Sequence, residues 1–203
     1  ADNCTGVGSF ALSENTTGAS NTAVGKHALF SNTTGSTNTA VGDEALKASS
    51  TGSHNTAVGV HALLSNTTAN NNTAIGQLSM EDNSTGAQNT AIGTSSLQYN
   101  TTASNNTAMG YAALEVNTTG HSNVAVGYRA LDSNTTANEN IAVGFRAMED
   151  STTGTGNVAV GKSALAGNTT GSYNTAVGLN ALETSDVDSN TAFGTSALRN
   201  TTT

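Results

Sequence analysis

Proline and tryptophan are missing from this chain, and cysteine, aromatic and basic residues are rare. The single cysteine, Cys4, allows no intrachain disulfide. Only 6 of the 203 residues are Lys or Arg, against 14 Asp and Glu, and this net charge of −8 argues against a nucleic-acid partner, which needs clustered cations. No run of about 18 apolar residues occurs, so we predict no membrane insertion. No signal peptide is visible, which is typical of a mature form or a fragment.

What the chain has instead is one motif, Asn21-Thr-Ala-Val-Gly25, repeated along its whole length. Successive copies begin 17 residues apart, except for a last step of 16, and Cys4 occupies the Asn position of a degenerate first copy. Self-similarity at a fixed period is the signature of a repeat architecture. We number each copy 1 to 17 from this Asn; the twelve copies begin at residues 4, 21, 38, 55, 72, 89, 106, 123, 140, 157, 174 and 190.

Each copy has two apolar segments and one turn. Positions 2 and 4 are β-branched or apolar at period two, which predicts a short strand with Ala and Gly on its other face. Gly at position 5 indicates a bend or a positive φ. Positions 8 and 9, mostly Ala-Leu, are a second core segment, and positions 6 to 11 around them form either a strand or one helical turn. Positions 12 to 15, Asn-Thr-Thr-Gly or similar, predict a turn, and positions 16 and 17 should be exposed.

A single copy is too short to bury a core, so neighbouring copies must stack and pair their backbones. We therefore predict an all-β fold, a parallel β-solenoid (β-roll) of about twelve 17-residue coils that forms one repeat array over residues 1–203. Each coil adds about 4.8 Å along the axis. Stacking would place like residues in columns of Val, Leu, Asn and Thr, with the Val and Leu columns as the expected core.

The repeated motifs Asn21-Thr-Ala-Val-Gly25 and Asn89-Thr-Ala-Ile-Gly93 resemble the head repeats of YadA-like trimeric autotransporter adhesins. The whole 17-residue unit is also similar to repeats of phage tail fibres and related bacterial surface fibres. The resemblance covers essentially the whole chain. It implies a left-handed parallel β-roll, three chains wound side by side, and display outside the cell for attachment.

Candidate catalytic and metal-binding residues are few. The four histidines occupy variable positions, and no two share a copy. No Ser or Thr has a local His and carboxylate for nucleophilic catalysis. We therefore expect no enzyme, no cofactor and no metal site. Asp186-Val-Asp188 resembles the start of a calcium loop, but the required Gly is missing, and a turn that adjusts the register of the short copy is favoured. Cys4 is interpreted as a small residue tolerated in the Asn position.

One surface patch is a candidate ligand site. Aromatic residues occupy position 6 of three consecutive copies, and carboxylates occupy position 10 of the same copies, with arginines three residues before two of them. The interpretations are a stabilising aromatic ladder with ion pairs, which we favour, or a patch for a glycan or receptor. The residues are Tyr111, Tyr128, Phe145, Arg129, Arg146, Glu115, Asp132 and Glu149.

Polar residues of the turn suggest two further possibilities. Asn-x-Ser/Thr sequons recur at position 12, although turn chemistry already explains them, and would be glycosylated only in a source that modifies extracellular proteins. Ice binding is disfavoured, because the Thr pairs at positions 13 and 14 are adjacent and do not share one strand face. The sequon residues are Asn15, Asn32, Asn66, Asn83, Asn100, Asn117, Asn134 and Asn168.

The sequence as a whole predicts an extracellular structural fibre, located outside the cell or on a cell or virion surface. Ala1-Asp2-Asn3 fits positions 15 to 17, and Thr203 occupies position 14, so the last coil can continue into the first coil of another copy. The expected partner is the chain itself, as a homo-oligomer or head-to-tail filament, with a trimer as one form. The alternative is an adhesin head or tail-fibre segment that binds a host receptor or glycan.

Overall fold

The computed structural model describes residues 3–200, and in that range the chain forms twelve three-residue strands and no helix. Each strand begins one residue after the start of a copy. The strands are β1 (Thr5–Val7), β2 (Thr22–Val24), β3 (Thr39–Val41), β4 (Thr56–Val58), β5 (Thr73–Ile75), β6 (Thr90–Ile92), β7 (Thr107–Met109), β8 (Val124–Val126), β9 (Ile141–Val143), β10 (Val158–Val160), β11 (Thr175–Val177) and β12 (Thr191–Phe193).

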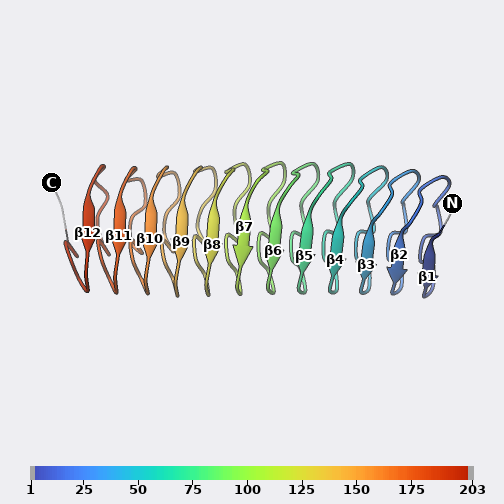
Figure 1. Ribbon diagram of the computed structural model, residues 1–203, viewed down its shortest axis with the longest axis horizontal. Helices are drawn as coiled ribbons and strands as arrows, with labels where there is room; N and C mark the ends of the chain where they lie inside the picture. Colours follow the sequence, from blue (N-terminus) through green and yellow to red (C-terminus); the bar gives the residue numbers. More distant parts are fainter. Residues whose placement is uncertain (1–2, 201–203) are drawn as a thin grey trace.

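The twelve strands form one parallel sheet in sequence order, β1 to β12. Like positions pair throughout, as in Ala23 with Ala40 and Ala176 with Ala192, so the shorter eleventh copy does not shift the register. Figure 1 shows the result, a rod of stacked coils with the two ends of the chain at opposite ends of the rod. The predicted parallel β-solenoid is confirmed, with about eleven full turns of coil.

The core is lined by small residues, and one expectation about it was wrong. Ala at position 3, such as Ala91, is fully buried, together with Ala at position 8 and Leu or Met at position 9. The apolar residue at position 4 points outward instead, and Ile75, for example, is 39% exposed. A Cβ at Gly6, which occupies position 3 of the first copy, would lie 3.5 Å from Ala11 O and 3.7 Å from Leu12 Cδ1, so a side chain larger than Ala would be crowded at this position.

Positions 6 to 11 form a run of tight turns, so the structure has neither of the two forms considered for them. Residues at positions 7 and 9 have positive φ, 56° at His27 and 49° at Leu29. Amides alternate between turn and stacking bonds: Ala28 N donates to Gly25 O within the coil, and Leu29 N donates to Ala45 O in the next coil. The backbone is thus satisfied along the axis without regular strand geometry.

Two columns of mostly buried Asn close the coils, with Ser49, Ser151 and Ser185 in place of Asn at position 12 of three copies. At position 1, Asn21 Nδ2 donates to Gly35 O (2.7 Å) in its own coil, and Asn21 Oδ1 accepts from Asn38 N (2.8 Å) in the next. At position 12, Asn32 Nδ2 donates to Gly35 O (3.0 Å), which is the predicted turn chemistry. Because these side chains are buried, each bond replaces one that water would otherwise make.

Gly at position 5 is required both by its backbone conformation and by the spacing of the coils. Gly59 has a φ of +139°, and a Cβ there would lie 2.4 Å from Gly76 O in the next coil. Only a residue without a side chain fits this contact.

Candidate functional site

The surface of residues 3–200 has no pocket, and no three His, Cys, Asp or Glu side chains in that range are grouped to hold a metal ion. The stacked coils align side chains into columns along the rod, and these columns are the candidate sites. Three such columns stand out: a polar column near the N-terminal end, the predicted aromatic and charged patch, and the outer face of the sheet.

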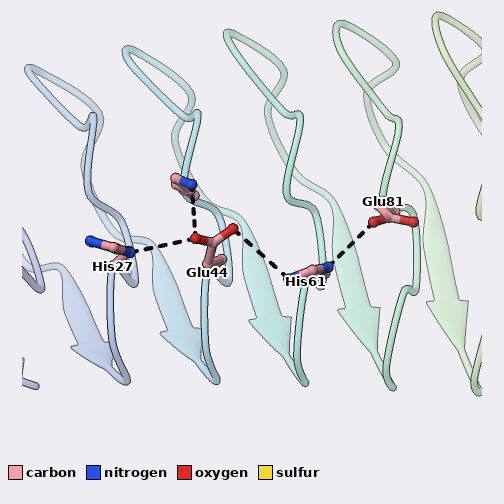
Figure 2. A network of polar contacts seen from close by, with 5 residues as sticks. His27, Glu44, His61 and Glu81 are labelled. Atoms are coloured by element: carbon pink, nitrogen blue, oxygen red, sulfur yellow. Dashed lines mark hydrogen bonds and ion pairs between the residues drawn. The ribbon is translucent and has the colours of Figure 1, made fainter.

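The polar column joins residues of four coils through positions 7 and 10 (Figure 2). Glu44 lies between two imidazoles, with Oε1 3.4 Å from His27 Nδ1 and Oε2 3.8 Å from His61 Nε2. The other nitrogen of His61, Nδ1, is 3.4 Å from Glu81 Oε1. Lys47 Nζ approaches Glu44 Oε1 at 2.8 Å. The result is a continuous chain of alternating imidazoles and carboxylates.

Aromatic rings pack against His27, the first imidazole of this polar column. Phe10 stacks on His27 at 5.3 Å, and Phe30 meets His27 edge-on at 5.5 Å. The hydrogen bond from Lys47, followed by the effects of nearby charges, keeps the pKa of Glu44 below its usual value despite its burial. His27 and His61 lie two coils apart, about 9.6 Å by strand spacing, which is too far for one metal ion.

This polar column was not predicted, because histidines were compared only within single copies of the repeat. The signal was present: His27, Glu44 and His61 occupy position 7 of three consecutive copies, each 17 residues after the last. Once coils stack in register, this spacing places the three side chains in contact.

The predicted aromatic column is a stack of nearly parallel rings. The Tyr111 and Tyr128 centroids are 5.4 Å apart, and the Tyr128 and Phe145 centroids are 5.1 Å apart, with interplanar angles of 12° and 10°. The three rings are 53%, 41% and 45% exposed. Cations flank the last ring, with Arg146 5.4 Å and Lys162 Nζ 5.7 Å from its centroid. These rings offer a continuous apolar surface with charge at one end.

The predicted ion pairs lie beside these rings. Arg129 binds Asp132 through Nε (2.8 Å) in its own coil and Glu149 through Nη1 (2.9 Å) in the next. Arg146 Nε is 3.5 Å from Glu149, so Arg146 connects the charged column to Phe145. Burial first, and the Asp132 carboxylate second, raise the pKa of Glu115 above its usual value.

The Asp186 turn supports the register-adjusting interpretation. In complete copies the backbone carbonyl at position 13 accepts hydrogen bonds from amides of the turn in the preceding coil. Thr33 O, for example, accepts from Thr16 N and Thr17 N. In the short copy Asp186 Oδ1 takes this role and accepts from Thr169 N (2.5 Å), Thr169 Oγ1 (2.8 Å) and Thr170 N (3.1 Å). Burial opposes ionisation of Asp186, but these bonds outweigh it and lower its pKa.

Seven of the eight sequon asparagines are buried, and the exception, Asn15, is half-buried. Their amide nitrogens, where a glycan would be attached, donate inside the rod, as Asn32 Nδ2 does to Asn15 Oδ1 at 2.7 Å. The folded coil therefore does not present these atoms to a transferase. Cys4 fits the Asn position, with its Sγ 3.3 Å from Gly18 O.

Comparisons with protein-family models, with curated proteins and with solved structures find no match for this chain. Residues 3–200 contain no helix with the length and apolar character needed to cross a bilayer. Function is therefore inferred from the geometry and side chains of the rod.

Proposed function

We propose that this chain is an extracellular structural fibre protein that self-associates by stacking coils head to tail. The observation that carries the proposal is the uniform register of the sheet, in which like positions pair between all neighbouring strands, as in Thr5 with Thr22 and Thr175 with Thr191.

The same register supports pairing between copies, because a strand edge can pair with a matching strand of another chain. The rod repeats in register, so the first coil of a second copy fits over the last coil as any inner coil does. A contact between two different ends of identical subunits continues as an open filament.

The Gly194→Ala variant tests this stacking. A Cβ at Gly178 would lie 2.5 Å from Gly194 O, but a Cβ at Gly194 meets nothing within 4 Å. In a filament the same Cβ would clash with Gly8 of the next copy, whereas in a single rod Ala meets only the strain of the φ of +120° at this position. We expect the wild-type chain to sediment as growing polymers and Gly194→Ala to stay as single rods.

Thr195→Ala is the matched control, because Thr195 is exposed beside the same end. It should polymerise like the wild type, and circular dichroism should show that all three chains are folded. Equal polymerisation of Gly194→Ala would overturn end-to-end stacking.

A second candidate function is supported by the aromatic stack. Rings 5.1 and 5.4 Å apart with polar side chains beside them suit the apolar faces of sugars, as in an adhesin or tail-fibre segment. We expect the double variant Tyr128→Ala, Phe145→Ala to lose binding on a glycan array while filaments still form.

Leu179→Ala is the control for that experiment, because Leu179 also occupies position 6 and is 42% exposed. Absence of glycan binding by the wild-type chain, or equal loss in the control, would reject the glycan surface.

A further inference from the structure

The outer face of the sheet carries two regular columns without charge. Position 2 contributes Thr in six consecutive strands, and position 4 contributes Val, Ile or Met in the same strands, β2 to β7. Position 3, between them, points into the core. The columns are Thr22, Thr39, Thr56, Thr73, Thr90 and Thr107, and Val24, Val41, Val58, Ile75, Ile92 and Met109.

The hydroxyls of this Thr column are unused by the protein. No side-chain hydrogen bond is formed by any of the six within residues 3–200. The hydroxyls at position 13 differ, because they donate to the next coil, as Thr33 Oγ1 does to Ser50 O (3.0 Å) and Thr101 Oγ1 to Thr118 O (3.1 Å). The hydroxyls of the sheet column are therefore available for an outside partner, whereas those of the turn threonines at position 13 are already bonded.

The array is also rigid. Every strand pair keeps the same register, for example Thr56 with Thr73 and Val58 with Ile75. Most of its side chains are β-branched, which restricts χ1 before any ligand binds. Binding therefore costs little side-chain entropy of the protein, even for a partner that makes many weak contacts.

The spacing of the array fits a water lattice. Hydrogen-bonded oxygens lie about 2.75 Å apart, so two oxygens tetrahedrally bonded to a common neighbour are about 4.5 Å apart. Neighbouring strands are about 4.8 Å apart. The difference of about 0.3 Å per coil grows to about 1.5 Å across the five steps from Thr22 to Thr107, less than half a lattice step.

We propose that the outer face of β2 to β7 binds the surface of ice. The hydroxyls occupy water sites of the lattice, and the methyl groups between them fill the gaps and exclude liquid water. A neutral lattice needs no counter-charge, which agrees with the absence of charge on this face. Ice binding was disfavoured above for the turn threonines, and this site uses a different column.

The test is the gap between melting and freezing temperatures of a single ice crystal in a solution of the full chain. Thr73→Lys places a long charged side chain in the middle of the array. Thr68→Lys makes the same change at an exposed turn position that has no side-chain hydrogen bond. Thr73→Val removes only the hydroxyl and keeps the shape.

We expect a measurable gap and faceted crystals with the wild type and Thr68→Lys, loss of both with Thr73→Lys, and a smaller gap with Thr73→Val. Circular dichroism establishes that each variant is folded. The proposal is overturned if the wild type has no gap, or if Thr68→Lys and Thr73→Lys reduce it equally. It is also overturned if sedimentation shows that a second copy covers this face, with Thr73→Lys separating the pair and no gap at any concentration.

Discussion

Buried asparagines at position 1 connect each coil to itself and to the next. Asn89 Nδ2 donates to Ala103 O (2.9 Å), and its Oδ1 accepts from Asn106 N (2.9 Å), with the side chain 1% exposed. This amide therefore supplies the acceptor for the buried Asn106 N, and it shares Ala103 O with Asn100 Nδ2, which also donates to that oxygen (3.1 Å).

Asn89→Ala should destabilise the rod, because it leaves Asn106 N unsatisfied and leaves Ala103 O with only its bond from Asn100 Nδ2 (3.1 Å). A buried unpaired group costs about 1–3 kcal/mol, so we expect a loss of about 1–3 kcal/mol. Chemical denaturation followed by circular dichroism measures it. Thr102→Ala, at an exposed position, should stay within about 0.5 kcal/mol. Equal midpoints for the two variants would contradict the role given to the amide.

The contribution of Glu115 to the stability of the rod should change with pH in the opposite direction to that of a carboxylate that stabilises the fold. Its pKa is raised by burial and by Asp132, so its ionised form is disfavoured in the folded chain. That cost is absent below the usual Glu pKa and develops as pH rises through the raised value. Glu115→Gln should therefore stabilise the rod at pH 7, by less than about 1 kcal/mol at this partly exposed site, and leave it unchanged near pH 3.

Thermal melts of both chains across this pH range provide the measurement. A stabilisation that persists at pH 3, or a destabilisation at pH 7, would contradict the direction given for Glu115.

At the scale of the element, the strand has a small inner face and a larger outer face. Ala91→Val adds two methyl groups to a fully buried position and should cost about 1–3 kcal/mol through overpacking. Ile92→Thr changes the adjacent outward side chain and should stay within about 0.5 kcal/mol. Denaturation midpoints decide between the two, and the reverse order would mean that the strand faces the other way.

This facing is also where sequence-based prediction reached its limit. Period two along Thr90-Ala-Ile92 identifies a strand with two faces, but it does not say which face is inside. Larger apolar residues usually occupy cores, and this favoured Ile92. The structure shows that the core has little room beside the strand, so Ala91 faces inward and Ile92 faces outward. The strands, the turns and the glycine bends were predictable because each depends on local residue chemistry.

The candidate sites follow the same division. The stack of Tyr111, Tyr128 and Phe145 and its ion pairs were predicted, because residues 17 apart come into contact once the register is known. The contact between His61 and Glu81 was not, because it joins position 7 of one coil to position 10 of the next. That relation joins two different positions of the repeat, which the period alone does not reveal.

At the scale of the whole molecule, the rod is a one-dimensional stack in which each coil contacts only its neighbours. Its stability is then close to a sum of coil and interface terms, and an open end lacks one interface. Under the proposed stacking, a second copy adds an interface of the same kind at the end of the rod. Assembly and stability should therefore be linked, with a melting temperature that rises with protein concentration.

Cryo-electron microscopy of the purified chain at several concentrations tests end-to-end stacking most directly. Twelve coils at about 4.8 Å give a single rod about 58 Å long. We expect filaments much longer than this, lengthening with concentration, with uninterrupted coil spacing across the junction between copies. Discrete rods of about 58 Å at every concentration would contradict the proposal.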